Sequence, residues 1–327
     1  MFLLSRVAES LFWLGRYVER AESTARLLDV TYHGRLEPQA TEVAGARNTW
    51  EAMMRTLGDG PGAKMLASAA GDPEAAAVDW LTVSRANSSS IVSCLAAARE
   101  NARSVRDFLS SETWVSINRL YHATSQRNVH LIMADGLYEF CDEVRHGVGL
   151  FAGLAASTSL HDEGWHWLQT GIHLERADMI TRIVDSKYHL ILDSAEEVGG
   201  VLDRHQWIAL LRSLSGFEAF RRTHAGGFEP GAIVEFLVLD RRFPRSLRAS
   251  VDSLLSSIDG ATEGADRRLQ AKALRPVTDL RNHLEFENVD SLIATGLHEF
   301  FLDAQATLRE ISSAVNQTFF WAAGSAA

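Results

Sequence analysis

Two segments of this chain repeat the same charged pattern at a fixed distance, and this repeat constrains the fold more than any other feature. Residues 17–33 read YVERAESTARLLDVTYH and residues 173–189 read HLERADMITRIVDSKYH, so that seven identical residues recur 156 positions later. Three further blocks recur in the same order, at offsets of 157, 156 and 160. Fixed offsets are typical of tandem structural repetition. The sequence therefore predicts an internally duplicated chain with two halves of about 160 residues.

The spacing of apolar residues predicts an all-α fold. Apolar residues recur every three or four positions between Leu11 and Tyr32, and the segment around 163–192 repeats this pattern. The chain has six prolines in 327 residues and few runs of alternating polarity, which disfavours strands. We expect two pseudo-equivalent helical bundles, residues 1–160 and 161–327, packed as one compact unit. Further helices are expected at 88–109, 128–156 (interrupted or bent near Gly136 and at 147–153), 204–223, 230–239, 245–258, 264–275 and 289–321, with a flexible loop from Gly58 to Asp72.

Composition narrows the classes of partner. A net charge of −10 disfavours general affinity for nucleic acid or for anionic membranes, since both attract basic surfaces. Two cysteines, Cys94 and Cys141, cannot form a disulfide framework or a cysteine-rich zinc site. The N-terminus carries charge where a signal peptide would be apolar, and no uncharged run reaches transmembrane length. We therefore expect a cytoplasmic protein that binds neither nucleic acid nor membrane.

The repeated charges form a stripe along one helix face. The first stripe is spaced by three, four, three and four residues, which places all its members on one side of a helix. Two structural interpretations are open, namely a solvated charged flank or a partly buried salt-bridge ladder that joins the halves. A buried ladder would fix register more than it would add net stability. The stripes are Glu19, Glu22, Arg26, Asp29 and His33, and then Glu175, Asp178, Arg182, Asp185 and His189.

A metal site is a second hypothesis for the same stripes. Helical bundles can hold metals with carboxylates and histidines on facing helices. Asp29 with His33, and Asp185 with His189, form pairs four residues apart. The spacing differs from the Glu-x-x-His pattern of ferritin-like proteins, and the arginine in each stripe would repel a cation. This hypothesis corresponds to an autonomous enzyme with a carboxylate and histidine centre, with or without a metal.

A third hypothesis is the binding of an anionic ligand or a peptide. Guanidinium groups suit carboxylates and phosphates, and arginines accompany the stripes and precede two expected helix starts. The sequence has no phosphate-binding loop, dinucleotide fingerprint, His-Glu-x-x-His or Gly-x-Ser-x-Gly motif, so that we expect no intrinsic cofactor and assign no catalytic residue. Beyond the acidic and arginine members of the two stripes, the ligand-binding candidates are Arg20, Arg85, Glu100, Arg103, Arg106, Arg176 and Arg241.

The opening segment LLSRVAESLFWLGRYVERAE, residues 3–22, closely resembles the bacterial alpha-E family, which is named for a predicted helical domain with a recurring Glu-Arg motif. Segments 98–107, 173–178 and 240–246 resemble its other signatures, so that the resemblance covers essentially the whole chain. The Glu-Arg motif maps to Glu19-Arg20 and Glu175-Arg176. The family offers no catalytic assignment to carry over.

The resemblance implies a partner and a process. Alpha-E proteins are usually encoded beside, or fused to, circularly permuted ATP-grasp proteins, and often near transglutaminase-like proteases. This association implies a role in ATP-dependent peptide synthesis or modification, in which the ligase binds ATP and magnesium. The first functional hypothesis is therefore a helical partner of an ATP-grasp-type ligase that holds the peptide or the ligase through its Arg/Glu faces. An autonomous enzyme and a purely structural adaptor are the alternatives.

Overall fold

The computed structural model describes residues 3–36, 46–68, 71–192, 201–224 and 226–320, and at 33–36, 46–48, 186–192 and 201–205 only the backbone is described. Regular structure within these ranges is helical throughout, which confirms the all-α prediction. The α-helices are α1 (Ser5–Leu36), α2 (Ala46–Thr56), α3 (Gly60–Ser68), α4 (Pro73–Thr82), α5 (Ile91–Ser104), α6 (Ser111–Ser125), α7 (Val129–Asp135), α8 (Leu137–Thr158), α9 (Glu163–Leu192), α10 (Val201–Ser213), α11 (Phe217–Thr223), α12 (Pro230–Val238), α13 (Leu247–Ala261), α14 (Arg267–Phe286), α15 (Val289–Thr295) and α16 (Leu297–Val315).

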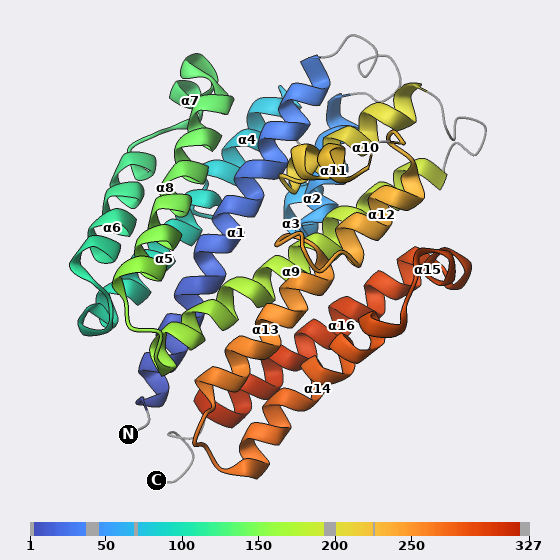
Figure 1. The fold of residues 1–327 in the computed structure, drawn as a ribbon. Coiled ribbons are helices and arrows are strands. Elements are labelled where there is room, and N and C mark those ends of the chain that lie inside the picture. Colours follow the sequence, from blue (N-terminus) through green and yellow to red (C-terminus); the bar gives the residue numbers. More distant parts are fainter. Residues whose placement is uncertain (1–2, 37–45, 69–70, 193–200, 225, 321–327) are drawn as a thin grey trace.

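Helices α1 and α9 cross at the centre of the molecule and run in the same direction (Figure 1). A Cβ atom on Gly15 of α1 would overlap the carbonyl oxygen of Leu168 in α9. Reciprocally, a Cβ atom on Gly171 of α9 would overlap the carbonyl oxygen of Phe12 in α1. Glycine inside a helix costs about 1 kcal/mol relative to alanine. Because Gly15 and Gly171 have no side chains, the backbones of α1 and α9 can touch at the crossing.

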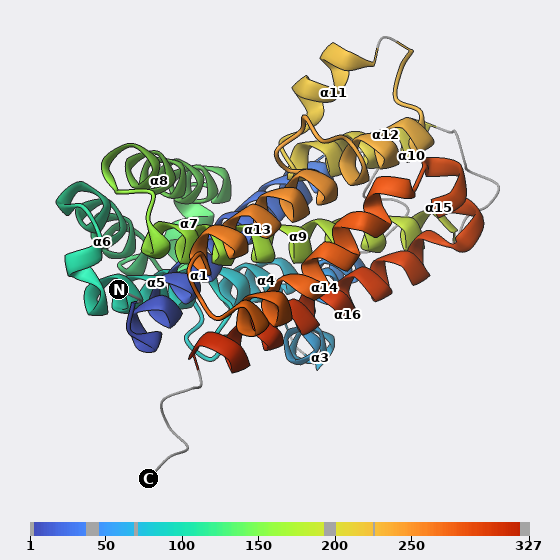
Figure 2. The ribbon, with the colours of Figure 1, turned by 60° about the horizontal axis from the view of Figure 1, so that its bottom comes forward.

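The remaining helices form two similar groups around this central pair. Helix α1 packs against α5 and α8, whereas α9 packs against α13 and α16. Figure 2 shows α5, α6 and α8 on one side of the central pair and α14 and α16 on the other. Helices α5 and α13 begin 156 positions apart, and α8 and α16 begin 160 positions apart. These repeated starts support the internal duplication, which itself remains an inference from the sequence.

Each central helix contributes side chains to both hydrophobic cores. Helix α1 places Phe12 in the core of α13, α14 and α16, and Val18 in the core of α5, α6 and α8. Helix α9 places Leu168 in the core of α5, α6 and α8, and Leu174 in the other core. The two groups of helices are thus packed together through their cores. The division into halves at residue 160 stays a prediction.

The segment after Gly58 is ordered as helix, and the predicted flexible loop from Gly58 to Asp72 was wrong. Residues Gly60–Ser68 form α3, whose Leu66 is fully buried. Asp59 accepts hydrogen bonds from the backbone N–H of Gly62 at 2.8 Å and from the indole N–H of Trp80 at 2.5 Å. The glycines and Pro61 indicate a break in isolation. Proline is nevertheless tolerated in the first turn of a helix, where its missing N–H leaves no hydrogen bond unmade.

Other helix boundaries also depart from the sequence-based expectation. Helix α14 continues past Pro276 to Phe286, and α6 was not predicted. Gly136 does separate α7 from α8, as expected, but α8 runs without interruption through residues 147–153. Ser215 breaks the predicted helix 204–223 into α10 and α11 and has a positive φ of 55°. Among the described residues, no helix has both the length and the apolar character that crossing a membrane requires.

Candidate functional site

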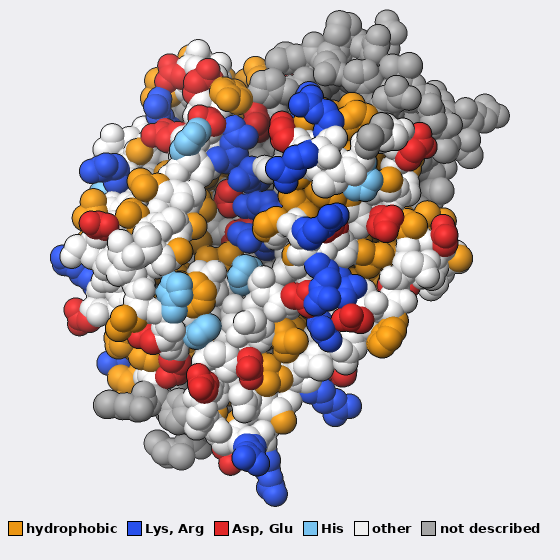
Figure 3. All heavy atoms as spheres, in the orientation of Figure 1, with side chains coloured by type: hydrophobic (Ala, Val, Ile, Leu, Met, Phe, Trp, Pro, Cys, Tyr) orange, Lys and Arg blue, Asp and Glu red, His pale blue; other side chains and the backbone are white. Residues whose placement is uncertain are grey.

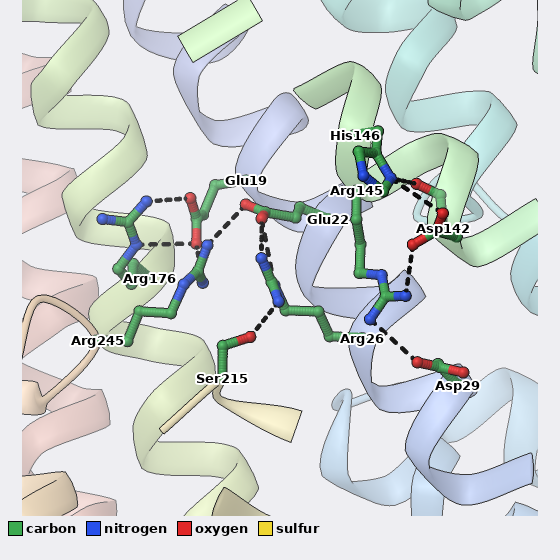
Figure 4. Close-up of polar contacts among 10 residues, drawn as sticks. All are labelled: Glu19, Glu22, Arg26, Asp29, Asp142, Arg145, His146, Arg176, Ser215 and Arg245. Carbon is green, nitrogen blue, oxygen red and sulfur yellow. Dashed lines mark hydrogen bonds and ion pairs between the residues drawn. The ribbon is translucent and has the colours of Figure 1, made fainter. Parts of the chain in front are cut away.

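Five side chains from three parts of the chain form a group of ion pairs that we call the Glu19 ladder (Figure 4). Arg176 of α9 binds Glu19 of α1 through two parallel hydrogen bonds of 3.0 and 2.6 Å. Arg245, just before α13, donates to Glu19 at 3.0 Å and to Glu22 at 2.8 Å. Arg26 donates to Glu22 at 3.2 and 2.5 Å. The ladder therefore joins α9, α1 and the segment before α13.

A second group, which we call the Glu175 ladder, also has three arginines but pairs them with a glutamate and an aspartate. Arg20 of α1 binds Glu175 of α9 through two hydrogen bonds of 2.6 and 3.0 Å, and Arg16 also donates to Glu175. One turn further along α9, Arg182 donates to Asp178 at 2.8 Å. Each ladder therefore has three guanidinium groups and two carboxylates.

The two Glu-Arg dipeptides exchange partners between the central helices. Glu19 pairs with Arg176 and Arg20 pairs with Glu175, so that each dipeptide both donates to and accepts from the other. Glu19 is only 2% exposed and Glu175 only 1%. This geometry is the buried salt-bridge ladder between the halves, one of the two structural interpretations that the sequence left open. Removing one partner would leave a buried charge uncompensated, so the ladders fix how α1 sits on α9.

Burial and the neighbouring arginines shift the pKa values of Glu19 and Glu175 in opposite directions. Burial by itself raises the pKa of Glu19, but Arg176 and Arg245 outweigh it and hold the pKa at about 2. Burial also raises the pKa of Glu175, and Arg16 and Arg20 again hold it at about 2. Both carboxylates are therefore ionised throughout the ordinary pH range, and by formal charge each ladder has one more guanidinium group than it has carboxyl groups.

The depressed pKa values predict a loss of stability in acid. A carboxyl group with a pKa of about 2 when folded and 4.5 when unfolded stabilises the fold fully above pH 4.5, and this contribution is lost as the pH falls through 2. We expect each of the two groups to contribute roughly 3 kcal/mol to this loss. Denaturant titrations between about pH 5.5 and about pH 2.5 measure the free energy of unfolding. Glu175→Gln should flatten the profile, and an unchanged profile would contradict the assignment.

The exposed side of the Glu19 ladder lies in a hollow of the surface. Figure 3 shows Lys/Arg and Asp/Glu side chains gathered in a depression along α1, between α8 and the α10–α13 region. Beside the ladder, Asp29 of α1 pairs with Arg145 of α8 at 3.1 Å, and Arg145 also pairs with Asp142 at 2.9 Å (Figure 4). The side chain of Arg26 is 17% exposed and that of Arg145 is 22% exposed. Solvent therefore reaches charged groups at the edge of an otherwise buried network.

The structure brings most, but not all, predicted ligand-binding candidates together. Asp29 lies beside the Glu19 ladder, whereas Asp185 pairs with His298 of α16 at 2.8 Å. The other candidates lie outside both ladders, and several form pairs of their own. Glu100 binds Arg103 at 2.6 Å on the exposed surface, and Arg241 binds Asp252 at 3.3 Å. Five candidates belong to neither ladder and to neither stripe, namely Arg85, Glu100, Arg103, Arg106 and Arg241.

The metal hypothesis concerns side chains that the structure describes only in part. His33 and His189 belong to α1 and α9, but their side chains lie outside the described residues. Among the described residues, no group of three or more His, Cys, Asp or Glu side chains is placed to hold a metal ion. Burial raises the pKa of the Cys94 thiol to about 12, so this thiol stays protonated. The metal site stays a prediction.

Several residues of the network were missed by reasoning from the sequence. Arg16 and Arg245 complete the ladders, Arg145 binds Asp29, and His298 binds Asp185. Arg245 belongs to segment 240–246, which resembles a family signature, so that a signal for it was present. Arg16 stands outside the repeated segments, and only the crossing of α1 with α9 brings it to Glu175.

An all-helical fold built on two crossing helices that exchange Glu-Arg pairs defines the class of this protein. The chain belongs to the Alpha-E family, described as a predicted alpha-helical domain with a conserved ER motif, and the family model matches residues 3–320. Uncharacterized proteins of Mycobacterium bovis and of two strains of Mycobacterium tuberculosis are each 27% identical to it over 330 residues, covering 96% of this chain. The chain spans only 36% of the length of each relative. No solved structure matches it.

Proposed function

We propose that this protein is a helical partner of an ATP-grasp-type ligase in ATP-dependent peptide synthesis or modification. In this role it holds the peptide or the ligase through the Arg/Glu faces in its hollow, while the ligase binds ATP and magnesium. ATP-grasp ligases activate a carboxylate with ATP, so that a partner protein in such a system must handle molecules that carry carboxylate groups. The chemistry of the hollow matches this requirement.

The excess of guanidinium groups over carboxylates within each ladder, as distinct from the neighbouring Arg145 with its two aspartates, carries the proposal. Each ladder has three guanidinium groups for two carboxylates, although the chain as a whole has a net charge of −10. Taking an uncompensated charge out of water is costly, and an anion that binds beside the ladder removes that cost. Guanidinium groups bind carboxylates through directional, charge-assisted hydrogen bonds.

The length of the relatives also supports a partner role. In the mycobacterial relatives, the region similar to this chain is joined to other sequence that makes up well over half of the protein. A region that is covalently joined to further sequence in its relatives is expected to act together with it. The resemblance described above implies that an ATP-grasp ligase is that partner.

Co-purification tests the proposal directly. The tagged full chain is recovered from its own bacterium, and mass spectrometry identifies the proteins that are retained. We expect an ATP-grasp protein to be enriched, and we expect the variant Arg26→Gln to retain less of it. Arg275→Gln is the matched control, since Arg275 is 84% exposed on α14, outside both ladders. Recovery without any ATP-grasp protein, from the wild type as well as from the control, would refute the partnership.

A further inference from the structure

The two ladders are alike in charge but differ in what surrounds them. Arg26 in the Glu19 ladder and Arg182 in the Glu175 ladder are 156 positions apart, and each approaches the turn at the end of another helix, which is α10 for Arg26 and α2 for Arg182. For Arg182 this turn contains Gly58, and for Arg26 it contains Ser215. The differences at this turn indicate which ladder is equipped to take a ligand.

Ser215 occupies a backbone conformation that favours glycine. Its φ is 55°, and Gly58, which is 157 positions earlier, has a φ of 73°. A side chain other than glycine in this region costs of order 1 kcal/mol or more. Serine nevertheless stands there, exposed to solvent, and its hydroxyl oxygen accepts a hydrogen bond from Nη1 of Arg26. The hydroxyl hydrogen is then free to bind an acceptor beside the arginine.

Arg26 pairs with a carboxylate that it shares with another arginine. Burial, followed by the nearby charge of Arg245, lowers its pKa even though Glu22 raises it. Glu22 divides its two oxygens between these arginines, with Oε1 facing Arg26 and Oε2 facing Arg245. In the other ladder, Glu175 outweighs burial and raises the pKa of Arg20. Arg26 therefore shares Glu22 with Arg245, whereas Arg245 also binds Glu19.

A histidine adds unused hydrogen-bonding capacity beside the same ladder. The Nδ1 atom of His173 is buried and has no hydrogen-bond partner among the described residues. Burial, and then Arg176, lower the pKa of His173 to about 3, so that the ring is neutral at ordinary pH. The residue 156 positions earlier is Tyr17, which has no counterpart of this ring nitrogen. The Glu19 ladder thus has two polar groups that the Glu175 ladder lacks, the hydroxyl of Ser215 and the ring nitrogen of His173.

We propose that the Glu19 ladder binds a single carboxylate group, which accepts hydrogen bonds from Arg26 and from the hydroxyl of Ser215. The formal excess of one guanidinium group matches one carboxylate, whereas a phosphate monoester carries about −1.5 to −2. The carboxylate belongs to the peptide that the ligase system extends or modifies, so that this inference rests on the proposed function. The Glu175 ladder has only a structural role, because Gly58 stands at the position of Ser215 and has no hydroxyl group to offer a ligand.

Calorimetric titration of the isolated full chain at low salt tests this site without any ligase. The probes are N-acetyl-Ala-Ala with a free C-terminal carboxylate, the same dipeptide with a C-terminal amide, and inorganic phosphate. We expect the acid to bind and the amide not to bind, because only the acid neutralises the excess charge. Arg26→Gln should weaken binding of the acid at least about tenfold, the usual scale for a charge-assisted hydrogen bond. Ser215→Gly should weaken it while raising the melting temperature, since glycine relieves the positive φ.

Arg182→Gln is the matched control, because it removes the equivalent arginine from the Glu175 ladder. It should lower the melting temperature, since Asp178 loses its partner, but it should leave binding of the acid unchanged. Equal loss of binding in Arg26→Gln and Arg182→Gln would refute the assignment to the Glu19 ladder. Binding of phosphate alone, or of neither peptide, would refute the carboxylate. Because no ligase is present, these outcomes are separate from the co-purification result.

Discussion

Glu175→Gln is expected to lower the free energy of unfolding by about 3–5 kcal/mol, the range for removing one member of a buried ion pair. The substitution keeps the shape of the side chain but leaves Arg16 and Arg20 without their shared carboxylate. The side chains of Glu175 and Arg16 are only 2% and 12% exposed, so that water replaces little of the lost interaction. Denaturant unfolding of the two proteins at neutral pH measures the difference.

An exposed ion pair provides the control for this prediction. Arg103 and Glu100 lie three residues apart on α5, with side chains 66% and 51% exposed. Arg103→Gln should change the free energy of unfolding by less than about 0.5 kcal/mol, because water screens such pairs. A loss in Glu175→Gln as small as that in Arg103→Gln would show that the ladder does not hold the central helices together. The large loss expected for Glu175→Gln also means that Arg20 and Arg176 cannot both be replaced without affecting the fold.

Gly15→Ala is expected to lower the free energy of unfolding by at least about 3 kcal/mol, at the upper end of the range for overpacking. The added methyl group would overlap the carbonyl oxygen of Leu168 and lie 2.9 Å from the backbone nitrogen of Ile172. Backbone atoms of a buried helix cannot rotate away as a flexible side chain can. Helices α1 and α9 would therefore have to separate, which also stretches both ladders. Gly171→Ala should have the same effect, since Phe12 and Arg16 face it in the same way.

Two glycines on α8 serve as controls for the crossing. A Cβ atom at Gly149 or Gly153 would meet no atom within 4 Å. Alanine at either position should raise the free energy of unfolding by up to about 1 kcal/mol, because helix propensity is then the only effect. Thermal and denaturant unfolding of the four alanine variants gives the comparison. Equal stability of Gly15→Ala and Gly149→Ala would mean that α1 and α9 do not touch as described.

The sequence predicted much of the fold because helical periodicity is a local property. The spacing of Leu11 to Tyr32 predicted α1, and the repeat at 156 positions predicted that α9 would resemble it. Local signals failed where tertiary packing overrides them. Leu66 packs α3 into a segment rich in glycine and proline, and α14 continues through Pro276. Side-chain burial, which no short window of sequence contains, decided both cases.

The candidate site was predictable as a set of residue types but not as a set of partners. The repeated Glu-Arg dipeptides and the stripe spacing identified Glu19, Arg20, Glu175 and Arg176. The sequence left open whether these residues pair between the two helices, because a charge on a helix can face solvent or a neighbouring helix equally well. The ligand-binding role of these residues stays a proposal.

The sequence by itself determined that the chain is helical and that two similar charged helices lie about half the chain apart. Only the tertiary structure decided that these helices cross at Gly15 and Gly171 and exchange their Glu-Arg pairs. Helical periodicity depends on residues three and four positions apart, and this spacing can be read directly from the sequence. An ion pair between α1 and α9 depends on the approach of two backbones some 156 residues apart, and only the packing of the whole chain sets that approach.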